Sequence, residues 1–125
     1  HPAESSHGDL GVIENDDLVI AISYGGESPE FSGILKFVAR KGMPLIAITG
    51  NPNSSLSKAA QVTLNVHVSE EACPLGLAPT ASSTATLAMG DSVAMAVMAE
   101  KGFSSEDFAE FHPGGSLGFR LLTHV

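Results

Sequence analysis

The stretch that decides the fold is Leu18-Val-Ile-Ala-Ile-Ser-Tyr-Gly-Gly-Glu-Ser28. Its apolar first half is typical of a β-strand buried on both faces, and we expect a strand over residues 18–23. The hydroxyl groups and paired glycines that follow leave backbone N–H groups free where a helix begins, an arrangement suited to binding an anion. An ordinary tight turn between a strand and a helix is the alternative explanation for the glycines.

A second copy of this pattern follows at Pro44-Leu-Ile-Ala-Ile-Thr-Gly-Asn-Pro-Asn-Ser-Ser55. We expect strands over residues 44–49 and 62–68, with helices over residues 29–41 and 54–60 between the three strands. Strands that alternate with helices predict right-handed crossovers, a parallel sheet and the α/β class. Ligands of such sheets bind at the carboxyl ends of the strands, where both polar loops would lie side by side.

The second half of the chain predicts helices. Residues 80–101 form an Ala- and Met-rich pattern that is apolar around most of its circumference, which indicates burial against both the sheet and a partner and therefore an oligomer. A membrane span is excluded because any window long enough to span would contain Pro79, Asp91 and the five hydroxyl residues from Thr80 to Thr86. The pattern Ser104-Ser-Glu-Asp107 starts another helix, and a last one is expected after Gly118.

Composition limits the classes of function. The 125 residues, 43% of them hydrophobic, are enough for one globular domain, and a net charge of −8 argues against nucleic acid or an anionic membrane as partner. A single cysteine, Cys73, excludes an internal disulfide framework and suits a reducing compartment, so we expect a cytoplasmic protein. Because no His or Cys pair has ligand spacing, no metal is expected, and we expect no cofactor. The chain opens at His1, and we expect it to be a piece of a longer protein.

Several short stretches together resemble the sugar isomerase (SIS) domain of arabinose-5-phosphate isomerases. They are His7-Gly-Asp-Leu-Gly11, Ile22-Ser-Tyr-Gly-Gly-Glu-Ser28, Thr49-Gly-Asn-Pro-Asn-Ser54, Glu71-Ala-Cys-Pro-Leu75, Leu77-Ala-Pro-Thr-Ala-Ser82, Met89-Gly-Asp91 and His112-Pro-Gly-Gly-Ser-Leu-Gly118. The resemblance implies a flavodoxin-like three-layer sandwich, of which residues 1–125 are a partial SIS domain without its N-terminal strands. Family members generally carry an earlier segment with a lysine used in the site, and most add tandem CBS modules; neither is part of these 125 residues.

The activity that the resemblance implies is an aldose–ketose isomerase. It would interconvert D-ribulose 5-phosphate and D-arabinose 5-phosphate through an enediol, as the entry to the Kdo sugar of lipopolysaccharide, in a homotetramer whose neighbouring subunits complete the active sites. Two alternatives stay open: a non-catalytic SIS domain that binds a sugar phosphate as a regulator, and an isomerase of another sugar phosphate. With the N-terminal strands missing, we expect an exposed edge beside residues 18–23 and weak catalysis by the excerpt alone.

Two acids match residues that the family needs. Glu71 follows the third predicted strand, and a carboxylate there can remove a proton beside a carbonyl if burial raises its pKa toward neutrality. The plainer reading is that Glu70 and Glu71 are solvated loop carboxylates. Glu30 lies in the first turn of the helix after the first loop, where negative charge is favoured in any case, and we expect it to position or polarise a hydroxyl.

Two histidines lie in family motifs. His7 and His112 are candidates for ring opening and for proton transfer between oxygens, since imidazole titrates near neutral pH. His112 is the better match to a residue required for activity, and one of the two is expected to reach the site from an adjacent subunit. His1 and His124 are expected at the surface. His67 is expected to pack on the sheet.

The binding residues are assigned to the loops. The phosphate is expected on the hydroxyl and N–H groups of the first loop, the sugar side on the second loop, and further hydrogen bonds from the start of the long helix. These residues are Ser23, Gly25, Gly26, Ser28, Thr49, Asn51 and Thr80. The family commonly has serine where this chain has Gly25, so one hydroxyl donor is lost.

Overall fold

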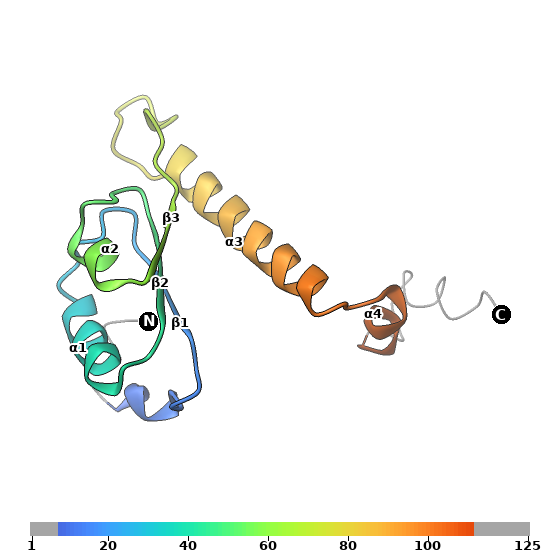
Figure 1. Cartoon of the computed structure of the whole chain (residues 1–125). Coiled ribbons are helices and arrows are strands. Elements are labelled where there is room, and N and C mark those ends of the chain that lie inside the picture. Colours follow the sequence, from blue (N-terminus) through green and yellow to red (C-terminus); the bar gives the residue numbers. More distant parts are fainter. Residues whose placement is uncertain (1–7, 112–125) are drawn as a thin grey trace. The chain divides into compact units, whose positions relative to one another are not determined.

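The computed structural model describes residues 8–111 (Figure 1). In chain order they form a short 3-10 helix (Asp9–Val12), β1 (Val19–Ile22), α1 (Phe31–Lys41), β2 (Leu45–Thr49), α2 (Ser55–Ala59), β3 (Val62–Asn65), α3 (Ala81–Glu100) and α4 (Ser105–Phe111). The chain divides into two compact units, His1–Met89 and Gly90–Val125, with the boundary inside α3. The first unit holds the sheet, the two polar loops and the first turns of α3.

The three strands form one parallel sheet in the order β1-β2-β3. The predicted α/β class is therefore confirmed. β2 lies in the centre, where Leu45, Ala47 and Ile48 are at most 2% exposed. β1 is an edge strand among the described residues, and Ile20 and Ile22 are 45% and 53% exposed. The expectation that residues 18–23 bury both faces is wrong for this part of the chain, whereas the expected exposed edge is confirmed.

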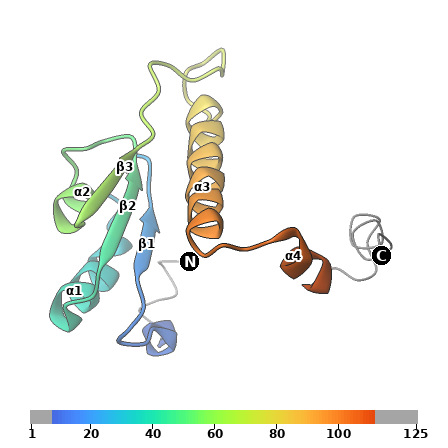
Figure 2. The same ribbon diagram turned by 45° about the vertical axis from the view of Figure 1, so that its right-hand side comes forward.

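Helices α1 and α2 lie on the same side of the sheet (Figures 1 and 2), where the main core forms. The alternation of a strand sends Ala21, Leu45 and Ala47 toward these helices, which contribute Phe31, Val38 and Leu56. α1 ends at Gly42, whose positive φ of 66° lets its N–H bond back to Ala39 O. This core fixes the carboxyl ends of β1 and β2 relative to each other.

β3 is shorter than predicted. It ends at Asn65 instead of Val68, because Asn65 Oδ1 accepts a hydrogen bond from the His67 backbone N–H at 2.9 Å and turns the chain out of the sheet. His67 is exposed beyond the end of the strand. The expectation that His67 packs on the sheet is therefore wrong.

The long helix matches its prediction within one residue at each end. Ser82 is the buried residue of α3, whereas apolar Leu87, Met95 and Val97 are 71%, 54% and 48% exposed. No helix within residues 8–111 is both long enough and apolar enough to cross a membrane. α4 begins where predicted, since Ser104 and Asp107 cap it reciprocally. The helix expected after Gly118 lies outside the described residues.

Candidate functional site

The two polar loops interlock at the carboxyl edge of the sheet. Tyr24 O accepts hydrogen bonds from Gly50 N and Thr49 Oγ1, both at 3.0 Å. Asn51 Nδ2 donates to Gly25 O at 3.4 Å, so the second loop is bonded to two consecutive carbonyl groups of the first loop. The predicted adjacency of the loops is confirmed.

Gly26 is required by the local geometry, and Gly25 is not. Gly26 has φ of 69°, and a Cβ at this position would lie 2.5 Å from Ser54 Cβ and closer still to Ser54 Oγ. The Gly26 carbonyl also accepts from Leu56 N in α2 at 3.1 Å. A Cβ on Gly25 would meet nothing within 4 Å. The tight-turn explanation thus accounts for Gly26 and leaves Gly25 open to another role.

The first loop keeps donors for an anion. Ser23 Oγ accepts from Gly26 N at 3.2 Å, which curls the loop around the serine hydroxyl. Within residues 8–111, the backbone N–H groups of Gly25 and Ser28 donate to no protein atom. Ser23 and Ser28 are half-buried. Hydroxyl and N–H donors of this kind are the groups that hold a phosphate at a strand-to-helix turn.

The polar groups of the second loop form hydrogen bonds to other protein atoms. Glu27 Oε1 accepts from Ser55 N at 2.8 Å and Ser54 Oγ accepts from Ser57 N at 3.2 Å, so both cap α2. The hydrogen bonds from the side chain and backbone of Ser55 lower the pKa of Glu27. Thr49 is fully buried, and its hydroxyl accepts from Asn51 N at 3.2 Å. Thr49 therefore supports the loops and does not reach the surface, contrary to the expectation that it shapes the sugar side.

Glu71 is bound through one carboxylate oxygen to the start of α3. Its Oε2 accepts hydrogen bonds from Thr80 N at 2.8 Å, Thr80 Oγ1 at 2.9 Å and Ser82 N at 3.2 Å. Hydrogen bonding from the Ser82 side chain and then from Thr80 N–H lowers the pKa of Glu71 to about 2, and the smaller effect of burial opposes this shift. The expectation that burial raises the pKa of Glu71 is wrong, because hydrogen bonds to the ionised form prevail.

Tyr24 is a residue that the sequence reasoning missed. Its hydroxyl accepts from Val68 N at 3.2 Å and donates to Val68 O at 3.5 Å, and its ring lies against Gly50. Tyr24 thus touches the segments that follow β2 and β3 as well as its own. The available signal was a single large aromatic residue inside a loop of small residues.

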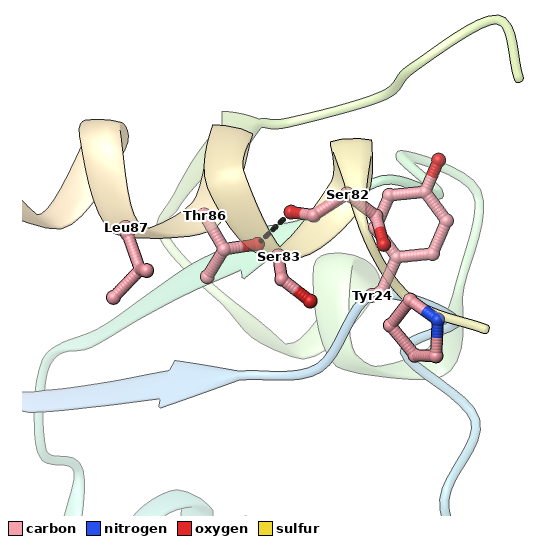
Figure 3. A pocket seen from close by; sticks show the side chains of 6 residues that line it. Tyr24, Ser82, Ser83, Thr86 and Leu87 are labelled. Carbon is pink, nitrogen blue, oxygen red and sulfur yellow. Dashed lines mark hydrogen bonds between the residues drawn. The ribbon is translucent and has the colours of Figure 1, made fainter. Parts of the chain in front are cut away.

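A cavity of about 370 Å³ lies between Tyr24 and the first turns of α3 (Figure 3). Thr86 Oγ1 donates to Ser82 O at 2.9 Å, which directs this hydroxyl at the helix backbone. The lining residues are Tyr24, Pro79, Ser82, Ser83, Thr86 and Leu87. The start of α3 therefore borders a hollow beside Tyr24, whereas the Thr80 hydroxyl donates to Glu71 Oε2 at 2.9 Å.

Three predicted residues remain, and the described part of the chain includes one of them, Glu30. Glu30 immediately precedes α1 and is exposed, with no side-chain cap bond to that helix. His7 and His112 lie outside the described residues. Within residues 8–111, no group of three or more His, Cys, Asp or Glu side chains converges as a metal site would require.

Comparison with known proteins identifies relatives. The SIS domain family matches residues 1–96. Arabinose 5-phosphate isomerases KdsD from Shigella flexneri and Pseudomonas aeruginosa are 55% and 54% identical over all 125 residues, which span 38% of each relative's length. The solved structure of Escherichia coli CFT073 c3406 in complex with arabinose 5-phosphate is 42% identical, with a TM-score of 0.84, over 90% of this chain and 60% of that one.

Proposed function

This chain belongs to the SIS domain family, and we propose that the protein carrying it interconverts D-ribulose 5-phosphate and D-arabinose 5-phosphate. The observation that carries this proposal is the 55% identity, over every residue of the chain, to relatives named arabinose 5-phosphate isomerase. The related structure bound to arabinose 5-phosphate supports a phosphorylated five-carbon sugar as ligand, although this chain covers 60% of that protein.

The geometry of the first loop supports binding of the phosphate. The 125 residues carry a net charge of −8, so they do not by themselves attract an anionic substrate at long range. Attraction must come at short range from Ser23, Ser28 and the N–H groups of Gly25 and Ser28, with Asn51 bonded beside them. Holding a phosphate that does not react converts its binding energy into orientation of the sugar carbons.

The chemistry that remains is proton transfer. The reaction removes a proton from C1 of the ketose, passes through an enediol and returns a proton to C2, while a second proton moves between the two oxygens. From the resemblance of their motifs, we assign ring opening and proton transfer between the oxygens to His112 and His7, with Glu30 positioning or polarising a hydroxyl. Glu71 is not assigned as base, because its carboxylate already accepts three hydrogen bonds.

A homotetramer is the proposed assembly. Its support is the apolar surface of α3, where Leu87, Met95 and Val97 are each about half exposed or more. Light scattering coupled to size-exclusion chromatography should give four times the subunit mass, and a monomer at micromolar concentration would contradict the proposal. The cytoplasmic location remains a prediction.

Proton NMR in deuterated water tests the activity directly. D-Ribulose 5-phosphate should convert to D-arabinose 5-phosphate with deuterium at C2. Ser28→Ala should raise KM about tenfold, the effect of losing one hydrogen bond to a charged group, whereas Ser32→Ala on the exposed face of α1 should not. Tight binding of the sugar phosphate without turnover or exchange would refute the isomerase and favour a regulatory domain.

A further inference from the structure

The loop between β3 and α3, residues 66–80, is tied down near both ends. At its start, the Val68 backbone holds the Tyr24 hydroxyl by two hydrogen bonds of 3.2 and 3.5 Å. Near its end, Glu71 binds Thr80 and Ser82 across nine and eleven residues of chain. Residues 72–79 between these ties are mostly exposed. They have no buried apolar side chain of their own to hold them.

The three hydrogen bonds to Glu71 all end on one carboxylate oxygen. Oε2 receives Thr80 N, Thr80 Oγ1 and Ser82 N, and Thr80 Oγ1 in turn accepts from Ala72 N at 2.8 Å. The carboxylate thus satisfies donors at the N-terminus of α3 and closes the loop onto itself. Taking up a proton would cost these charge-assisted bonds, which are stronger than neutral ones.

The tie at Tyr24 is equally well supported. Its carbonyl is held by Gly50 N and Thr49 Oγ1, and Gly50 has no Cβ that would displace the ring. The same ring forms a wall of the cavity at the start of α3 (Figure 3). The position of Tyr24 is therefore set by the ends of β1 and β2. Through its hydrogen bonds to Val68, Tyr24 also holds the loop after β3.

We propose that Glu71 is a positioning residue which, together with Tyr24, fixes the 66–80 loop and the first turn of α3 beside the substrate loops. The inference rests on the proposed isomerase function and assigns Glu71 a role other than proton transfer. Its carboxylate acts through Thr80 and Ser82, of which Ser82 lines the cavity. Glu71 is needed because its carboxylate oxygen accepts hydrogen bonds from Thr80 and Ser82, and it does not take up the proton of the substrate.

Kinetics of the full-length protein separate the two roles. Glu71→Gln keeps an acceptor oxygen for the Thr80 and Ser82 N–H groups, so kcat should fall by about tenfold or less, and the pH profile of kcat should keep its shape. Tyr24→Phe should cause a loss of similar size. Glu70→Gln, at the exposed neighbouring carboxylate, is the matched control and should leave kcat unchanged. Loss of a base would instead lower kcat by about 10²- to 10⁴-fold and remove the acidic limb of the profile, which would overturn the proposal.

A measurement without turnover tests the same tie. In NMR spectra, the amide protons of Thr80 and Ser82 should shift together as pH falls, with a midpoint near the pKa of about 2. Glu71→Gln should abolish that titration, and Glu70→Gln should not. A midpoint at the ordinary carboxyl pKa of 4.5 in the wild-type protein would refute the hydrogen bonds of Glu71 to Thr80 and Ser82. If the wild-type protein titrates as expected but does not isomerise the sugar, the proposed function fails while the tie stands.

Discussion

Replacing Gly26 with alanine should destabilise the first compact unit by about 2–5 kcal/mol. Two effects of the structure add at this position. An alanine held at φ of 69° costs about 1–2 kcal/mol. Its Cβ would also lie 2.5 Å from Ser54 Cβ, an overlap of the kind that costs about 1–3 kcal/mol. Ser54 cannot withdraw easily, because it is fully buried and caps α2.

Three other glycines separate these effects. Gly42→Ala meets the same positive φ in open space and should cost about 1–2 kcal/mol. Gly50→Ala has no positive φ but would place its Cβ 2.7 Å from Tyr24 Cζ, and should cost about 1–3 kcal/mol. Gly25 has neither a positive φ nor a close neighbour, so the free energy of unfolding of Gly25→Ala should lie within about 0.5 kcal/mol of the wild-type value.

Native-state hydrogen exchange of the β2 amides measures these differences in the full-length protein. The central strand exchanges through the larger openings of its unit, so a loss of about 2–5 kcal/mol speeds its exchange roughly 30- to 4,000-fold. A second substitution gives an internal check. Ser54→Gly costs a few tenths of a kcal/mol as a cap. Combined with Gly26→Ala, it should restore about 1–3 kcal/mol by removing the overlap.

One outcome refutes the reasoning. If Gly26→Ala is no more destabilising than Gly42→Ala, and Ser54→Gly rescues nothing, the two loops do not approach each other as the structure has them. The close approach of Gly26 to Ser54 would then contribute nothing to stability, and the interlocking of the two loops would be contradicted.

Three further predictions use the same exchange measurement. Leu56→Ala removes a fully buried side chain of α2 and should cost about 2–5 kcal/mol, whereas Leu75→Ala, 77% exposed, should change stability by less than about 0.5 kcal/mol. Ser54→Ala should cost about 0.5–2 kcal/mol through loss of the α2 cap, while Ser32→Ala on α1 should be nearly neutral; equal effects of the two would contradict the cap. Because the pKa of Glu71 is lowered from 4.5 to about 2, its stabilisation of the 66–80 loop is fully present above pH 4.5 and lost as the pH falls through about 2, so protection of the Thr80 amide should drop in that window and not between pH 5 and 8.

Part of the candidate site could be predicted from the sequence. Two apolar runs, each ending in small polar residues, were enough to place Ser23, Gly26 and Asn51 at one edge of a parallel sheet, because the order of strands and helices leaves little choice of topology. Glu71 was placed correctly in the chain but given the wrong environment. Its pKa depends on Thr80 and Ser82, which lie nine and eleven residues away and face it only after the loop closes.

The sequence by itself determined the α/β class, the helix and strand order and the presence of two glycine- and hydroxyl-rich loops, since these follow from local periodicity and chain connectivity. The tertiary structure alone decided which glycine is indispensable, because only the approach of Ser54 distinguishes Gly26 from Gly25. It also decided that Thr49 lies inside and that Tyr24 joins three strand ends. Contacts between residues distant in the chain set hydrogen-bond satisfaction and burial, and no local pattern of residues encodes them.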